Sequence, residues 1–130
     1  MKLKLSNEKI INTINVLGKL NNAQLPIKVA YAISKNVNKI ESELKVYNTE
    51  KAKLIDRYAK KDEEGKLKAD EYGNVNIKEE HMEDWNKDVK ELLSIENETD
   101  VHMIQLDDLL NSNYNISPAE LTAIDFMIND

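Results

Sequence analysis

An unbroken apolar stripe between Pro26 and about Lys60 constrains the fold of this chain more than any other feature. Apolar residues recur there at steps of three and four, the spacing of a helix in a coiled coil. No glycine or proline interrupts the segment, so one helix roughly 50 Å long is predicted. A lone stripe has nothing to bury against in water, so this helix needs a partner. The stripe consists of Ala30, Ile33, Val37, Ile40, Leu44, Tyr47, Leu54 and Tyr58, with Lys51 as its charged member.

A shorter stripe between Lys78 and Glu96 supplies a partner for the long helix. Met82, Trp85, Val89 and Leu92 repeat the same spacing, with Leu93 and Ile95 alongside. The long helix carries lysines and the short one carries acids, which favours antiparallel pairing of the two over self-association of either. The lysines are Lys39, Lys45, Lys51 and Lys53, and the acids are Glu79, Glu80, Glu83, Asp84, Asp88 and Glu91.

The polar segment between the two helices predicts a small β-hairpin at their far end. Leu67 and Ala69 alternate with polar residues, as do Val75 and Ile77, so the two pairs are expected to face each other. The sequence "DEYG", residues 70–73, reads as the turn between them. The hairpin tip is therefore expected over residues 62–78.

The chain's two ends predict a base of short strands and helices. "MKLKL" alternates as a strand does, and Ser6 or Asn7 then caps a helix. "ENETD" reads as a polar break, and "VHMIQL", residues 101–106, is expected to pair as a strand with "MKLKL". The first helix buries a stripe that consists of Ile10, Ile11, Ile14, Leu17 and Leu20.

A capping box marks the start of a C-terminal helix. Ser117 stands at the N-cap, Pro118 at the first helical position and Glu120 at the third. An apolar helix is expected to follow and to dock on the core through Leu121, Ile124, Phe126, Met127 and Ile128. The predicted fold is α+β and mostly helical. It is a single domain, 1–130, in which a long coiled-coil-like helical hairpin (26–96) stands on a base formed by 1–25 and 97–130.

Residue types exclude most kinds of chemistry. The chain has no cysteine, which rules out disulfides, thiolate metal sites and cysteine nucleophiles. Three glycines leave no phosphate-binding loop, and His81 and His102 lack partners at metal-ligand spacing. A calcium loop over 60–71 would begin with Lys60, an ammonium where a carboxylate is required. We therefore expect no catalytic residues, no cofactor and no metal, and hence not an enzyme.

Charge and composition narrow the expected partners. Arg57 is the single arginine among 18 basic residues, which argues against direct nucleic-acid binding. Residues 1–61 carry a net charge of +8 and residues 62–130 a net charge of −14. The two halves either neutralise each other within the fold or present opposite surfaces to partners. No apolar run approaches a membrane span and the N-terminus lacks a signal sequence, so a cytoplasmic protein is expected.

Six residues near the far end of the hairpin are the candidate partner-binding residues. The single tryptophan either belongs to the seam or anchors a partner, because tryptophan is common in binding hot spots. The tyrosine in the turn either packs across the hairpin or contacts a partner. The set consists of Tyr72, Glu79, Glu80, Glu83, Asp84 and Trp85.

Most of the chain resembles a family of small phage and prophage proteins of unknown function from low-GC Gram-positive bacteria. The resemblance lies in the segment from "IINTINVLGKLNNAQLP" through "KAKLIDRYAKKDEEGK", in "GNVNI", in "WNKDVKELLSIE" and in "SPAELTAIDFMI". It implies a phage-encoded protein in a bacterial cytoplasm or in a virion, and no catalytic residue can be transferred from it.

The expected function is non-catalytic protein binding, in which a phage-encoded module engages a host or phage protein and inhibits a host defence system or host machine. The alternative is a small virion or tail assembly protein, which would form a homo-oligomer through the helix seam. Imitation of nucleic acid by the acidic half ranks lower, because its charge is spread over 69 residues.

Overall fold

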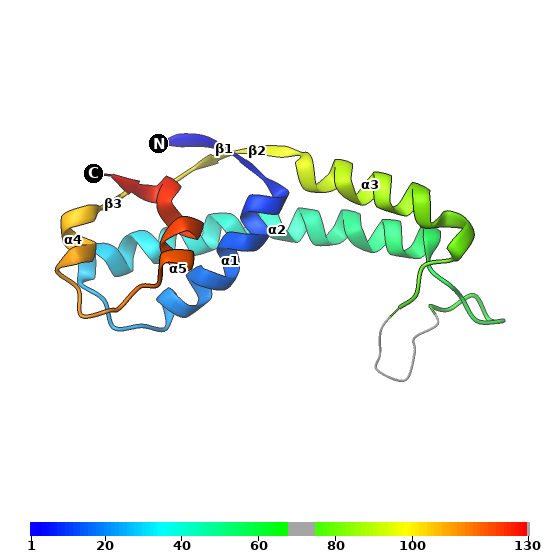
Figure 1. Ribbon diagram of the computed structural model, residues 1–130, viewed down its shortest axis with the longest axis horizontal. Helices are drawn as coiled ribbons and strands as arrows, with labels where there is room; N and C mark the ends of the chain where they lie inside the picture. Colours follow the sequence, from blue (N-terminus) through cyan, green and yellow to red (C-terminus); the bar gives the residue numbers. More distant parts are fainter. Residues whose placement is uncertain (68–74, 130) are drawn as a thin grey trace. The chain divides into compact units, whose positions relative to one another are not determined.

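The computed structural model describes residues 1–67 and 75–129 (Figure 1). The chain is mostly helical with a small antiparallel pair of strands. It divides into two compact units: unit 1 consists of Met1–Leu44 and Glu96–Asp130, and unit 2 consists of Lys45–Ile95. The elements are β1 (Lys2–Ser6), α1 (Asn7–Asn21), α2 (Ile27–Tyr58), η1 (Glu79–His81), α3 (Met82–Ser94), β2 (Glu96–Asp100), β3 (Ile104–Gln105), α4 (Leu106–Leu110), α5 (Pro118–Ile124), η2 (Asp125–Met127) and β4 (Ile128–Asn129).

The long helix is confirmed as α2, which runs without a break from Ile27 to Tyr58. Its stripe is deeply buried in unit 1, where Ile33 and Ile40 are each 1% exposed. In unit 2 the same stripe is shallower, because Tyr47 is buried but Leu54 and Tyr58 are half-buried. The same apolar pattern is therefore deeply buried in unit 1 and less buried in unit 2.

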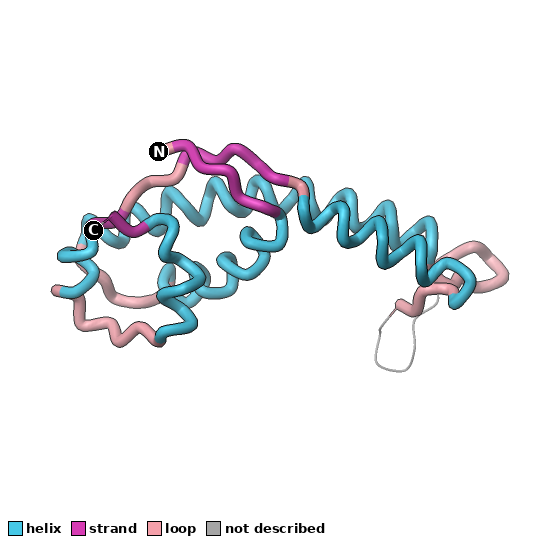
Figure 2. Tube along the Cα trace, turned by 45° about the horizontal axis from the view of Figure 1, so that its top comes forward, coloured by secondary structure: helices cyan, strands magenta, loops and turns pink. Residues whose placement is uncertain are grey.

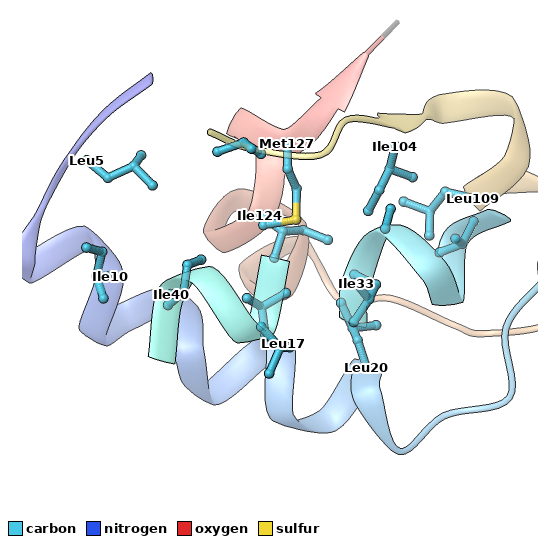
Figure 3. Close-up of a cluster of buried hydrophobic side chains, with 14 residues drawn as sticks. Leu5, Ile10, Leu17, Leu20, Ile33, Ile40, Ile104, Leu109, Ile124 and Met127 are labelled. Carbon is cyan, nitrogen blue, oxygen red and sulfur yellow. The ribbon is translucent and has the colours of Figure 1, made fainter. Parts of the chain in front are cut away.

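The core of unit 1 forms where α1 and α5 meet the first half of α2. Ser6 caps α1 as predicted, because its hydroxyl accepts a hydrogen bond from the Lys9 amide at 3.1 Å. Leu17 of α1 and Ile124 of α5 are fully buried, and Figure 3 shows both pointing toward the side chains of α2. The cluster also includes Leu5, Ile10, Leu20, Val29, Ala32, Ile33, Val37, Ile40, Val101, Ile104, Leu109 and Met127.

The partner of β1 is not the predicted segment. β1 pairs antiparallel with β2, so "ENETD" is a strand and the predicted pairing of "VHMIQL" with "MKLKL" is wrong. The register places Lys2 opposite Asp100 and Lys4 opposite Glu98. Opposite charges on facing strands stabilise a pair whose outer surface remains in water. The acidic residues of "ENETD" suggested a polar break between elements. In the structure the same residues pair with the lysines of β1.

The residues after β2 form other elements. Only Ile104–Gln105 is a strand in the described part of that segment, and this β3 pairs in parallel with β4. The short helix α4 follows directly and was not predicted from the sequence. The capping box at Ser117 is confirmed in full. The helix that it starts ends at Ile124, however, so the prediction of a helix reaching Ile128 is wrong, because Ile128 pairs with Ile104 instead.

Unit 2 consists of the second half of α2, the short turn η1 and the helix α3. Figures 1 and 2 both show α3 running alongside the second half of α2. Leu92 is buried, and Trp85 and Val89 are half-buried. Met82 was expected in the seam but is 42% exposed, because it begins α3 directly after the turn.

The predicted β-hairpin tip, 62–78, falls partly outside the described residues. Ala69 and the turn at residues 70–73 lie outside them, so the predicted facing pairs stay a prediction. The described residues on either side form isolated antiparallel bridges, Ala59 with Ile77 and Lys61 with Leu67. The first bridge holds the start of the connecting segment, directly after α2, against its end, directly before η1.

Candidate protein-binding surface

Four carboxylates gather on η1 and the first turn of α3, and we call them the acidic segment: Glu79, Glu80, Glu83 and Asp84. All four are exposed. Acids are favoured at this position because the free amides at a helix N-terminus carry partial positive charge. Among the described residues, only Glu80 has an ionic partner, His81, whose Nε2 lies 3.9 Å from Oε1. The other three carboxylates are exposed and form no ion pair with the described residues.

Trp85 packs within unit 2. Its ring lies 6.4 Å from the ring of Tyr58, edge to face at 82°, and the side chain is half-buried. The Tyr58 hydroxyl donates a hydrogen bond to Asp88 at 2.6 Å. The pKa of Tyr58 is raised from its usual value of 10.0, chiefly because this hydrogen bond favours the protonated phenol. The contacts favour the interpretation of Trp85 as a packing residue of the seam. Tyr72 lies outside the described residues.

The opposite charges of the two helices do not pair across unit 2. Among the described residues, no ion pair joins α2 to α3. One cation of α2 is engaged locally, Lys53 with Glu50 at 3.0 Å, and Lys61, three residues after the helix, pairs with Asp56 at 3.4 Å. Such exposed pairs contribute little to stability. Ion pairs between the described residues of α2 and α3 therefore do not hold the two helices together.

A groove of about 380 Å³ lies in unit 1 at the start of α2. Its floor is apolar, because Val29 and Ile104 are almost fully buried. At its rim Ile27 is 85% exposed and Tyr31 is 55% exposed, which is unusual for large apolar side chains. The other lining residues are Lys28, His102, Met103, Gln105 and Asp108. Exposed apolar side chains beside a recess are typical of a binding surface.

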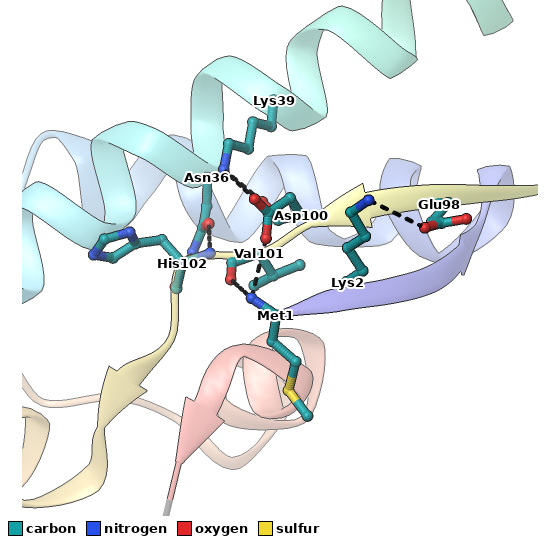
Figure 4. Close-up of polar contacts among 8 residues, drawn as sticks. All are labelled: Met1, Lys2, Asn36, Lys39, Glu98, Asp100, Val101 and His102. Atoms are coloured by element: carbon teal, nitrogen blue, oxygen red, sulfur yellow. Dashed lines mark hydrogen bonds and ion pairs between the residues drawn. The ribbon is translucent and has the colours of Figure 1, made fainter.

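A buried asparagine positions one wall of this groove. Asn36 is 1% exposed, and Figure 4 shows its amide against the backbone of His102. It donates to the His102 carbonyl at 2.9 Å and accepts from the His102 amide at 2.8 Å. The His102 ring then lies 5.4 Å from the ring of Tyr31 at 73°. One side chain of α2 therefore fixes both the course of the chain after β2 and the placement of an exposed ring pair.

Sequence reasoning missed the groove because its rim residues lie off the apolar stripe of α2. Ile27 and Tyr31 are one turn apart, on a face that the stripe leaves in water. An apolar pair at that spacing outside the stripe was the available signal. The residues from Met103 to Asp108 gave none, because they reach the groove through the non-local pairing of β3 with β4.

Tests for other kinds of site give negative results within the described residues. No group of three or more His, Cys, Asp or Glu side chains there could hold a metal ion. No helix in the described part of the chain has the length and apolarity to cross a membrane. The acidic segment and the groove are the candidate binding surfaces.

Comparison with known proteins returns no relative: no family model, no curated protein and no solved structure matches the chain. The resemblance to phage proteins therefore stays a prediction.

Proposed function

We propose that this chain is a non-catalytic protein-binding module that recognises a basic surface of its partner through the acidic segment. The observation that carries the proposal is the set of four exposed carboxylates, three of which have no partner among the described residues. Electrostatic complementarity of this kind speeds association and selects partners. The groove at Ile27 and Tyr31 offers an apolar contact in addition, in the other unit.

The acidic segment is presented by a helical hairpin with a coiled-coil-like seam and a β-hairpin tip. Support comes from Tyr58, near the end of α2, which contacts His81, Trp85 and Asp88 near the start of α3. Contacts between the end of one helix and the start of the next are those of an antiparallel pair. In such a pair the acidic segment stands next to the tip, where a partner can approach it.

The sequence resemblance supports a phage-encoded inhibitor that acts in the bacterial cytoplasm on a host defence system or host machine. The second candidate is a small virion or tail assembly protein, favoured by the seam of unit 2, in which Leu54, Trp85 and Val89 are only half-buried and can pack on another copy. Mass spectrometry of purified phage particles separates the two. An inhibitor is expected to be absent from particles, whereas stoichiometric amounts in virions would contradict it.

The acidic segment is tested with a charge-matched pair of variants. In the first, Glu79→Gln, Glu80→Gln, Glu83→Gln and Asp84→Asn neutralise the segment. In the second, the exposed acids Glu8, Glu41, Glu96 and Asp107 are changed to their amides. Both variants change the net charge equally, so a difference between them reports position.

The measurement begins with capture of partners from host lysate, followed by titration calorimetry with the purified partner. Four lost charge contacts are expected to weaken binding about tenfold or more, and more strongly at low salt. The control variant is expected to bind as wild type does. Equal affinity of all three proteins would remove the acidic segment from the proposal. A third variant, Ile27→Ser with Tyr31→Ser, then shows whether the groove makes the contact instead.

A further inference from the structure

The first turns of α2 carry a ridge of exposed side chains, which we call the α2 ridge: Ile27, Tyr31 and Lys35. The three residues are spaced four apart, so they lie in one row along the helix. Ile27 is 85% exposed and Tyr31 is 55% exposed. The Lys35 ammonium lies 5.5 Å from the centre of the Tyr31 ring, so the apolar row ends in a positive charge.

The groove of unit 1 lies directly beside this ridge, because Ile27 and Tyr31 line it. Helices pack by placing the ridge of one into the groove beside a ridge of the other. A cavity of about 150 Å³ holds one benzene-sized group. The groove, at about 380 Å³, therefore has room for roughly two apolar side chains. A ridge beside such a recess matches the surface of a second helix.

Other kinds of occupant fit this surface less well. A small molecule in the recess would leave Ile27 in water, because most of that side chain is exposed at the rim. An extended peptide that adds as a strand needs free backbone groups along the wall. At His102 the side chain of Asn36 already engages both the amide and the carbonyl. A helix uses side chains alone and covers the rim as well as the recess.

The two walls of the groove carry opposite charges. Lys28 belongs to the wall formed by α2, and Asp108 belongs to the wall formed by residues 102–108. Figure 1 shows α4, which carries Asp108, beside the start of α2. Among the described residues, no ion pair engages either side chain. The charges therefore favour a ligand that is acidic toward α2 and basic toward α4.

We propose that the groove binds an amphipathic helix of a partner protein, whose apolar stripe has acidic residues on one flank and basic residues on the other. Ile27 and Tyr31 contact the stripe, Lys28 pairs with the acidic flank, and Asp108 pairs with the basic flank. Recognition of a helix in a groove uses apolar anchors at positions i and i+4 of the ligand. The proposal is independent of the acidic segment, because the groove belongs to unit 1 and the acidic segment to unit 2.

The test uses the full chain and three synthetic helical peptides with the same leucine stripe. The first has glutamates on one flank and lysines on the other, the second has lysines on both flanks, and the third has glutamates on both. Fluorescence anisotropy should give a dissociation constant on the order of 100 µM for the mixed peptide. The other two should bind about threefold to tenfold more weakly. The same ranking is expected when the acidic segment is neutralised.

Reversing the charge of one wall should change which peptide binds best. Lys28→Glu makes both walls acidic and should favour the double-lysine peptide, whereas Asp108→Lys makes both basic and should favour the double-glutamate peptide. The two changes together restore one wall of each sign at the original net charge, so preference for the mixed peptide should return. Glu41→Lys alters the net charge as Asp108→Lys does, but at an exposed position outside the groove lining, and should leave the ranking unchanged.

Three outcomes would overturn the proposal. One is the absence of binding of every peptide at 1 mM, and another is a ranking that ignores the wall charges. The variant Ile27→Ser with Tyr31→Ser should weaken binding at least tenfold with an unchanged circular-dichroism spectrum, and equal binding would show that the peptides bind elsewhere. Sedimentation of wild type at about 200 µM should give a monomer. A dimer that this variant abolishes would make a second copy the occupant and contradict the proposal.

Discussion

The two units of this chain differ in where their apolar side chains lie. In unit 1, 14 buried hydrophobic residues form one cluster drawn from helices and strands far apart in the sequence. In the described residues of unit 2, three hydrophobic residues are buried, and most of the others on α2 and α3 are only half-buried. Unit 1 therefore has a core of its own, whereas unit 2 is a surface-rich pair of helices.

The difference teaches that one periodic stripe does not imply one kind of packing. α2 carries its pattern through both units, yet the depth of burial depends on how many other elements converge on it. α1, α5 and the strands cover it in unit 1, and the described elements of unit 2 offer α3. A shallow core beside an acidic surface is the arrangement expected of a region that binds other molecules.

The largest difference between the units is expected from deleting leucine side chains. Leu17→Ala in unit 1 should cost about 2–5 kcal/mol of unfolding free energy, because a fully buried side chain leaves a cavity. Leu54→Ala in unit 2 should cost about 1 kcal/mol, because the side chain is half-exposed already. Urea unfolding followed by circular dichroism measures both. Fluorescence of Trp85, the single tryptophan, reports on unit 2. Equal losses for the two variants would break the comparison.

The next largest loss of stability is expected from removing the contact between the Asn36 side chain and the His102 backbone. Asn36→Ala removes both hydrogen bonds to the His102 backbone and leaves buried groups unsatisfied, which should cost about 1–3 kcal/mol. Asn38→Ala is the matched control, since Asn38 is exposed on the same helix. It should change stability by less than about 0.5 kcal/mol. A loss at position 38 as large as that at position 36 would contradict the assignment, because Asn→Ala by itself favours the helix and the loss could not then be due to the His102 contact.

The parts of this fold that could be predicted depend on patterns of residues close together in the sequence. The stripe of α2 and the caps at Ser6 and Ser117 depend on residues within one or two turns of each other, so the sequence displays them directly. The positions of Glu79, Glu80, Glu83 and Asp84 in and beside a short acidic helix followed from the same kind of signal.

The parts of the fold that the sequence did not predict depend on pairing between residues far apart in the chain. β2 has no apolar alternation and becomes a strand because its acids face the lysines of β1, about 95 residues away in the sequence. β4 takes Ile128 out of the predicted helix for a similar reason. The groove depends on Asn36, a polar residue beside an apolar stripe whose contact with His102 spans 66 positions. No local pattern indicates such a contact.

Two buried threonines of unit 1 differ in whether their hydroxyl groups form hydrogen bonds. Thr13 is fully buried, and its hydroxyl donates to the carbonyls of Lys9 and Ala123. Thr99 is 4% exposed, and its hydroxyl has no hydrogen-bond partner among the described residues. Thr13→Val should therefore cost about 1 kcal/mol, whereas Thr99→Val should stabilise by up to about 1 kcal/mol, because it removes an unsatisfied buried group. Urea midpoints that move in the same direction for both variants would contradict this assignment.

The smallest effect is expected from two tyrosine–carboxylate contacts, one in each unit. Tyr58 donates to Asp88 in unit 2, and Tyr114 donates to Glu120 at 2.8 Å in unit 1. Each hydrogen bond raises the pKa of its tyrosine above the usual 10.0. A raised pKa means that the folded state holds the phenol proton more tightly than the unfolded state. The stability from each contact is therefore fully present below pH 10 and is lost as the pH rises through the folded value.

Absorbance at 295 nm between about pH 9 and 12 follows the ionisation of all five tyrosines, these two included. Asp88→Asn should return Tyr58 toward its usual pKa without changing Tyr114, and Glu120→Gln should do the reverse. Subtracting the curves of Tyr58→Phe and Tyr114→Phe assigns each component. Because unit 2 has the shallower core, its unfolding near pH 11 is expected before that of unit 1. Trp85 fluorescence should then change at a lower pH than the circular-dichroism signal. Simultaneous loss of the two signals would mean that the units unfold as one, and that the half-buried stripe of α2 couples them more strongly than its exposure implies.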